Sequence, residues 1–203
     1  RIWQETVRAL MTSSPAIYFK TLMDCGALRA IMPQTYSFFL PDSPSLLALA
    51  AAADNNESAY IRFSCLYPPV SFVSSDQLTA LFKHLRFPIP FNERALLINT
   101  YLSELISAQQ ALCAKGLASL FRKMDAFRKP DRFIDTLKAS YYLAVASSQP
   151  LDVTKQQTVI AALEVYRRVN ASDIIAEGYK GKEIGEQLYL KRIQQIAKIK
   201  GIT

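Results

Sequence analysis

The chain has 203 residues, of which half are hydrophobic and 20% are charged, with six glycines and a formal net charge of +7. This length and apolar content can form a buried core, and they exclude the disordered and collagen-like classes. The single histidine, His84, excludes any site that needs two imidazoles, while the basic excess favours a nucleic-acid or other anionic partner.

Cysteine spacing and hydropathy indicate the compartment. Cys25, Cys65 and Cys113 are far apart and form no Cys-x-x-Cys pair, which is typical of reduced thiols in a cytosolic protein. The longest uncharged apolar run, residues 46–53, is far shorter than the roughly 20 residues of a membrane span. No signal peptide opens the chain, so we expect a soluble, cytoplasmic protein with no membrane partner. Because Arg1 rather than methionine stands first, we also expect a piece of a longer protein.

Apolar periodicity is helical along nearly all of the chain, which predicts an all-α fold. The first predicted element is an amphipathic helix over residues 2–10. A second helix is predicted with Ser14 as N-cap, Pro15 at its first position and Gly26 just past its end. A third is predicted from residues 42–44 to about Asp54.

Capping residues and prolines also mark the predicted starts of the later helices. Ser74 and Gln77 have the spacing of a capping box. Asn92 is predicted to cap a long segment that runs through Leu112, and Pro130 to begin a segment that runs through Val145. Breaks at 33–45, 67–75 and 147–155 divide the chain into an entry segment, a central bundle and a C-terminal unit, with bounds 1–32, 33–147 and 148–203.

Positive charge is concentrated in the second half of the chain, with a net charge of +1 over residues 1–100 and +6 over residues 101–203. Each basic cluster alone is compatible with a solvated helix face, but two clusters in one half favour an anionic polymer. The clusters are Arg122, Lys123, Arg128, Lys129, Arg132 and Lys138, and Lys180, Lys182, Lys191, Arg192, Lys198 and Lys200.

The most specific local pattern is the glycine-containing turn at residues 177–185. We expect a short helix to end at Gly178 and a new helix to begin near Lys182. The unpaired N–H groups at such a helix start bind phosphate, flanking lysines strengthen the site, and Gly181 permits close approach to the backbone. The alternative is an ordinary corner between two helices with surface lysines.

Nothing in the sequence forms a catalytic or metal-binding constellation. His84 has no Cys or His partner nearby and is expected to be a surface or packing residue. The carboxylates are scattered, without an Asp-x-Asp or Glu-x-x-His pattern.

Three stretches of the chain follow one another in a pattern that one family shares. They are residues 1–5, continued by 9–12, Pro15, Tyr18, Phe19, Leu22, 24–28 and Pro33; residues 121–130 with Arg132; and residues 176–184 with Leu188, Lys191, Arg192 and Ile193. In this order they resemble the bacterial class II CCA-adding enzymes, which are tRNA nucleotidyltransferases.

The resemblance implies helical body and tail domains, with neck-end helices over 1–32, a body over 33–147 and a tail over 148–203. The family's head adds CCA to tRNA 3′ ends from CTP and ATP with Mg²⁺, and it precedes the part that this chain resembles. The region seen here is expected to hold the acceptor stem and elbow of tRNA through phosphate contacts and to be inactive alone. The expected contacts are Lys180, Gly181, Lys182, Lys191, Arg192, Arg128, Lys129 and Arg132, with no catalytic or metal-binding residue.

The chain departs from the family pattern at two places. The multifunctional members carry a His-Asp (HD) metal phosphohydrolase, whose motif aligns with residues 62–70, but Pro68 and Pro69 replace the His-Asp dyad. Since that site needs several imidazoles, we expect no phosphohydrolase activity. Members of the family from enteric bacteria carry arginine at the position of Gly185, so we expect one contact with tRNA to be weaker here. The alternative function is a non-catalytic helical scaffold or protein-interaction module.

Overall fold

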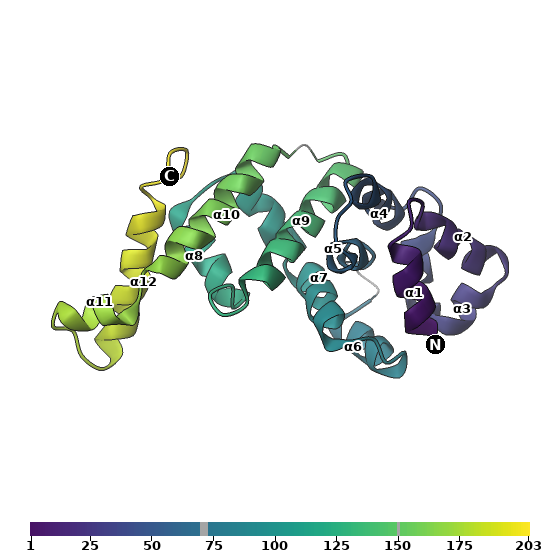
Figure 1. Ribbon diagram of the computed structural model, residues 1–203, viewed down its shortest axis with the longest axis horizontal. Helices are drawn as coiled ribbons and strands as arrows, with labels where there is room; N and C mark the ends of the chain where they lie inside the picture. The colour runs from purple at the N-terminus through teal and green to yellow at the C-terminus, as the bar shows by residue number, and fades with distance from the viewer. Residues whose placement is uncertain (70–72, 150) are drawn as a thin grey trace. The chain divides into compact units, whose positions relative to one another are not determined.

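A computed structural model describes residues 1–69, 73–149 and 151–203, and Val70, the last residue of the HD-like stretch, lies outside these ranges. The fold is all-α, as predicted, and the described residues contain no sheet (Figure 1). The helices are α1 (Ile2–Leu10), α2 (Ala16–Asp24), α3 (Ala27–Ile31), the 3₁₀ helix η1 (Pro33–Phe39), α4 (Pro44–Asp54), α5 (Ala59–Ser64), α6 (Ser75–His84), α7 (Ile89–Gln110), α8 (Ala114–Lys123), α9 (Pro130–Ala146), α10 (Val153–Arg168), α11 (Ala171–Ala176) and α12 (Lys182–Ile196).

Several helix boundaries were predicted correctly from adjacent residues. The Ser43 hydroxyl accepts a hydrogen bond from the Leu46 amide at the start of α4. At α6 the Gln77 amide donates to Ser74 Oγ at 3.2 Å, and the Ser74 amide donates to Gln77 Oε1 at 2.8 Å, which completes the capping box. Gly26 lies just past α2 with a φ of +75°, the left-handed conformation expected of it.

Two predicted N-caps were wrong. Pro15, already in helical conformation, is the N-cap of α2, and Ser14 contributes its carbonyl oxygen, which accepts from the Ile17 amide. Helix α7 begins at Ile89, since the proline that follows it is tolerated in the first turn of a helix. Asn92 therefore lies inside the helix, where its Nδ2 donates to the Phe87 carbonyl at 2.9 Å.

The chain forms two compact units, whose boundaries fall inside α7 and α9. Unit 1 comprises residues 1–103 and 135–150, and unit 2 comprises residues 104–134 and 151–203. The three-part division suggested by the sequence stays a prediction. No described helix is long and apolar enough to cross a bilayer.

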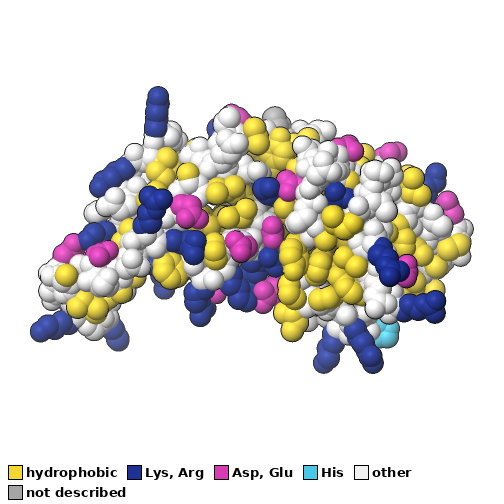
Figure 2. Space-filling model, in the orientation of Figure 1, with side chains coloured by type: hydrophobic (Ala, Val, Ile, Leu, Met, Phe, Trp, Pro, Cys, Tyr) yellow, Lys and Arg dark blue, Asp and Glu magenta, His cyan; other side chains and the backbone are white. Residues whose placement is uncertain are grey.

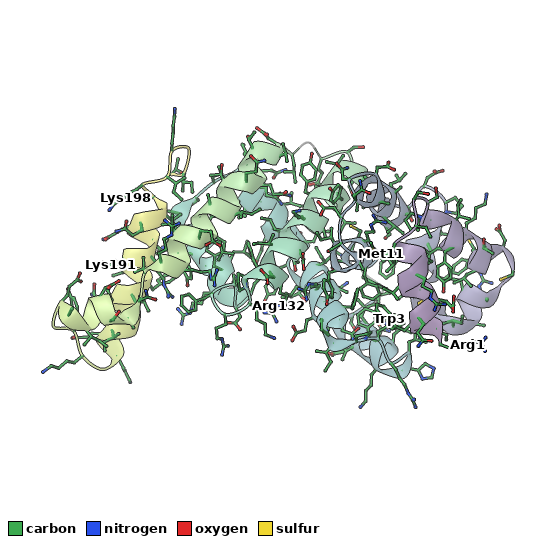
Figure 3. All side chains as sticks on the ribbon, in the orientation of Figure 1. Arg1, Trp3, Met11, Arg132, Lys191 and Lys198 are labelled. Atoms are coloured by element: carbon green, nitrogen blue, oxygen red, sulfur yellow. The ribbon has the colours of Figure 1, made fainter. Side chains whose placement is uncertain are left out.

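An aromatic cluster and a buried arginine hold α1 onto α5 in unit 1. The Trp3 ring lies 4.4 Å from that of Phe91 and 5.7 Å from that of Phe63, between ring centroids (Figure 3). Arg62 is 3% exposed, and its Nη1 donates to the Leu10 carbonyl at 2.7 Å and to the Thr12 carbonyl at 3.0 Å. This guanidinium therefore satisfies the carbonyls at the end of α1, which would otherwise lack partners.

In unit 2, α8 and α10 pack against α12 (Figure 1). The core includes Phe121, whose ring lies 5.1 Å from Phe133 and 5.4 Å from Tyr166. The final residues close this unit onto the start of α8. The Thr203 amide donates to the Leu112 carbonyl at 2.9 Å, and the Thr203 carbonyl accepts from the Ala114 amide at 2.8 Å.

Candidate nucleic-acid interface

The predicted turn between α11 and α12 is present and presents two lysines. Gly181 has φ +58° and ψ −127°, and the Glu183 amide donates to the Lys180 carbonyl at 3.3 Å. These angles are those of a type II′ turn, whose first central position favours glycine. Lys180 and Lys182 are exposed, and neither ammonium group has a hydrogen bond or ion pair to a described residue, so both are available to an anion.

Lys191, expected to contact phosphate, already has an acidic neighbour. Its ammonium pairs with the carboxylate of Glu177, the residue that ends α11. Figure 3 shows Lys191 on α12. The pair ties α11 to α12 and neutralises part of the positive charge, so the contribution of Lys191 to an anion site is smaller than that of a free lysine.

Arg192 also has partners inside unit 2. Its Nε and Nη2 donate to the Val169 carbonyl at 3.3 and 3.1 Å. Its Cζ lies 4.5 Å from the ring centroids of both Phe127 and Tyr166. The half-buried guanidinium is therefore held by one carbonyl and two aromatic faces, an arrangement that fixes α12 against α10 and the segment after α8.

The segment that follows α8 holds the second group of expected contacts. Asp125 has φ +53°, and the Ala126 amide donates to the Phe121 carbonyl at 2.9 Å in a Schellman arrangement. Asp125 accepts a hydrogen bond from Arg128 Nε at 2.8 Å, and this bond, aided by the charges of Arg128, Arg132 and Lys129, holds the pKa of Asp125 below its ordinary value. Arg132 Nη2 donates to the Met124 carbonyl at 2.7 Å, and Lys129 is exposed.

Two adjoining hollows of about 600 and 380 Å³ form what we call the basic groove, entirely within unit 2. It is lined by Phe121, Arg122, Asp125, Phe127, Arg128, Tyr166, Asn170, Ala171, Lys182, Gly185, Glu186, Leu188, Tyr189, Leu190 and Arg192. Four of these residues, Arg122, Tyr166, Leu188 and Arg192, line both hollows, so the two are adjacent.

The basic groove brings together only part of the predicted set. Lys182, Arg128 and Arg192 line it, whereas the other five expected contacts, Lys180, Gly181, Lys191, Lys129 and Arg132, lie outside its lining. Arg122 lines both hollows, with its Cζ 5.8 Å from the Tyr189 ring centroid, and was not among the expected contacts. Its membership in the first basic cluster was the only sequence signal for it. Figure 2 colours the Lys and Arg side chains dark blue on the face that it draws, where they are spread along the chain.

No metal site competes with this interpretation in the part of the chain that the structure describes. No group of three or more His, Cys, Asp or Glu side chains there has the geometry to hold an ion. His84 is exposed at the end of α6.

Comparisons with known proteins point to one family. The chain is 30% identical over 196 residues to a CCA-adding enzyme of Pseudomonas putida, covering 97% of this chain and 50% of that protein. It is 29% identical to the CCA-adding enzyme of Actinobacillus succinogenes (98% of this chain, 55% of the relative) and to the multifunctional CCA protein of Hahella chejuensis (98% and 54%). The chain thus spans about half the length of the curated relatives it matches. No family model and no solved structure matches it. The chain is therefore similar, along nearly its whole length, to the C-terminal part of CCA-adding enzymes.

Proposed function

We propose that this chain is the tRNA-binding region of a cytoplasmic tRNA nucleotidyltransferase that adds CCA to tRNA 3′ ends from CTP and ATP. The observation that carries the proposal is the lysine turn at residues 180–182, which lies in the same unit as the basic groove. The match to CCA-adding enzymes supports the identity of the nucleic acid.

The contacts are to the phosphates and shape of tRNA, at its acceptor stem and elbow. A-form RNA has a major groove too narrow for side chains to read, so backbone charge and shape dominate recognition of its helical parts. Lys180 and Lys182 contribute most, because no acidic side chain among the described residues neutralises them. Lys191 and Arg128 contribute less, since each is already paired.

The remaining expected contacts have different roles within this proposal. Arg132 and Lys129 extend the positive surface beside Arg128, with Arg132 also holding the end of α8. Arg192 positions the aromatic side chains of the groove instead of meeting phosphate directly. Gly181 supplies the turn that places both lysines at the start of α12.

The 203 residues alone are proposed to have neither nucleotidyltransferase nor phosphohydrolase activity. The Mg²⁺, CTP and ATP sites are assigned to the head of the relatives, and Pro68 and Pro69 occupy the position of the HD dyad. A scaffold role is supported less well, because a protein-docking surface would not require the basic groove.

The proposal is tested by gel shift of labelled tRNA over a salt series. The double variant Lys180→Glu/Lys182→Glu should weaken binding and flatten the plot of log K against log salt by about 0.7–0.9 for each phosphate that the turn no longer neutralises. The control is Lys20→Glu/Lys115→Glu, which has the same net charge but changes exposed lysines outside the groove. Unchanged binding by the first variant, or equally weakened binding by both, would contradict the assignment of the turn.

A further inference from the structure

The basic groove contains aromatic side chains that a purely phosphate-binding surface does not need. Phe127 is 37% exposed, although it is large and apolar, and Tyr189 is half-buried. Both line the groove beside Arg122 and Lys182. Exposed aromatic faces next to cations are characteristic of surfaces that bind unpaired nucleotides.

Phe127 is held in place by several contacts. The left-handed Asp125 and the buried Ala126 fix the backbone just before it. Its carbonyl accepts from Arg167 Nε at 3.3 Å, and the Arg192 guanidinium lies 4.5 Å from its ring centroid. These contacts constrain the backbone at Phe127 and place a guanidinium beside its ring, which reduces the conformational entropy lost when a ligand stacks on it.

Tyr189 is placed in a similar way on α12, next to the Arg122 guanidinium at 5.8 Å from its ring centroid. Four aromatic rings line the groove, of which Phe121 and Tyr166 are buried. The other two, Phe127 and Tyr189, each lie beside an arginine, and Lys182 begins the helix that carries Tyr189. Its hollows of about 600 and 380 Å³ lie within the range of pockets that hold small ligands, about 300–1,000 Å³.

We propose that the basic groove receives one unpaired nucleobase of RNA, stacked on Phe127 or Tyr189, with the adjoining phosphate at Arg122 and Lys182. This inference rests on the proposed function and adds that the bound RNA presents an unstacked nucleotide as well as a helical backbone. Since every base has a stacking face, the groove accepts different bases with little preference.

The test compares three labelled RNA hairpins by fluorescence anisotropy with the whole 203-residue chain. One hairpin is fully paired, one has a single bulged nucleotide, and one has an abasic site at that bulge. We expect the bulged hairpin to bind about tenfold more tightly than the other two, a typical effect for stacking of one base. Equal affinity for the bulged and abasic hairpins would overturn the proposal.

Two variants test whether the preference for the bulged hairpin comes from the basic groove. Phe127→Leu and Tyr189→Leu keep apolar volume but remove the aromatic face, so at least one should lose the preference for the bulged base while keeping its salt-dependent binding to the paired hairpin. The matched control is Tyr36→Leu, whose ring also lies beside an arginine, at 4.8 Å from Arg29 Cζ, but in unit 1.

The outcomes separate this proposal from the proposed function. A thermal melt of each variant checks folding, and Phe127→Met replaces Phe127→Leu if that variant does not fold. If both folded variants keep the preference, the groove does not stack the base. If instead Lys180→Glu/Lys182→Glu leaves tRNA binding unchanged, the lysine turn is not the phosphate site, whatever the result for the bulge.

Discussion

Asp125 accepts a 2.8 Å hydrogen bond from Nε of Arg128, three residues further along the chain. The bond places a carboxylate inside the cluster formed by Arg128, Lys129 and Arg132, and this environment lowers the pKa of Asp125. A carboxylate whose pKa is lowered by folding stabilises the folded state at pH values above its ordinary pKa. This stabilisation is lost as the pH falls through the lowered pKa. The carboxylate is therefore charged at neutral pH, and it opposes the binding of an anion at this surface.

Removing that charge should strengthen RNA binding. Asp125→Asn keeps a residue that tolerates the left-handed φ of +53° and releases the Arg128 guanidinium. We expect tRNA affinity to rise by about twofold to fivefold at low salt, in line with the strength of exposed charge pairs. Gel shift measures the change, with Asp76→Asn in unit 1 as the control of equal charge. A fall in affinity would mean that Asp125 chiefly orients Arg128.

The two glycines at the start of α12 should respond oppositely to alanine. Gly181 has a φ of +58° that alanine adopts only with strain, although no atom lies within 4 Å of the point that its Cβ would occupy. Gly181→Ala should therefore cost about 1–2 kcal/mol of unfolding free energy. Gly185 is helical with open space around it, so Gly185→Ala should stabilise the protein by about 0.5–1 kcal/mol. Urea denaturation measures both, and a destabilised Gly185→Ala would disprove the helical assignment there.

Arg62 should be among the most sensitive positions for stability. Its guanidinium donates to the carbonyls of Leu10, Thr12, Ala53 and Glu57, and the side chain is 3% exposed. Arg62→Met leaves these carbonyls without their donor, at a cost of about 3 kcal/mol or more. Arg8→Met, at a side chain that is 77% exposed, should change the unfolding free energy by less than about 0.5 kcal/mol. Similar effects in the two variants would contradict the role of Arg62.

The three thiols should differ in reactivity. Cys25 and Cys113 are exposed, whereas Cys65 is buried, and burial together with the charge of Glu57 raises the pKa of its thiol. Since the thiolate is the reacting species, iodoacetamide should modify Cys25 and Cys113 in the native protein and Cys65 only after denaturation. Mass spectrometry of the labelled peptides counts the modified sites. Rapid native labelling of Cys65 would show that α5 opens readily.

Sequence predicted several features that depend on neighbouring residues, although the N-caps at Ser14 and Asn92 were wrong, and it could not predict contacts between distant residues. The capping box of Ser74 and Gln77 spans four residues, so its pattern is visible in the chain itself. The environment of Arg192 requires Phe127 and Tyr166 to meet it from other elements, and no local pattern encodes that meeting. For the same reason, the sequence alone does not show that the Arg192 guanidinium also contacts other parts of its own unit, and its expected contact with phosphate stays a prediction.

The hydrogen bonds that join Thr203 to Leu112 and Ala114 also have a consequence for the order in which the native contacts of unit 2 can form. The chain is synthesised from its N-terminus, so α8 leaves the ribosome long before its distant partner, and the pairing of Leu112 with Thr203 closes a separation of 91 residues. Contacts so distant in sequence slow folding. The first amide of α8 thus gains its native backbone acceptor only after Thr203 has been synthesised, so the native hydrogen bonds of unit 2 are incomplete until then.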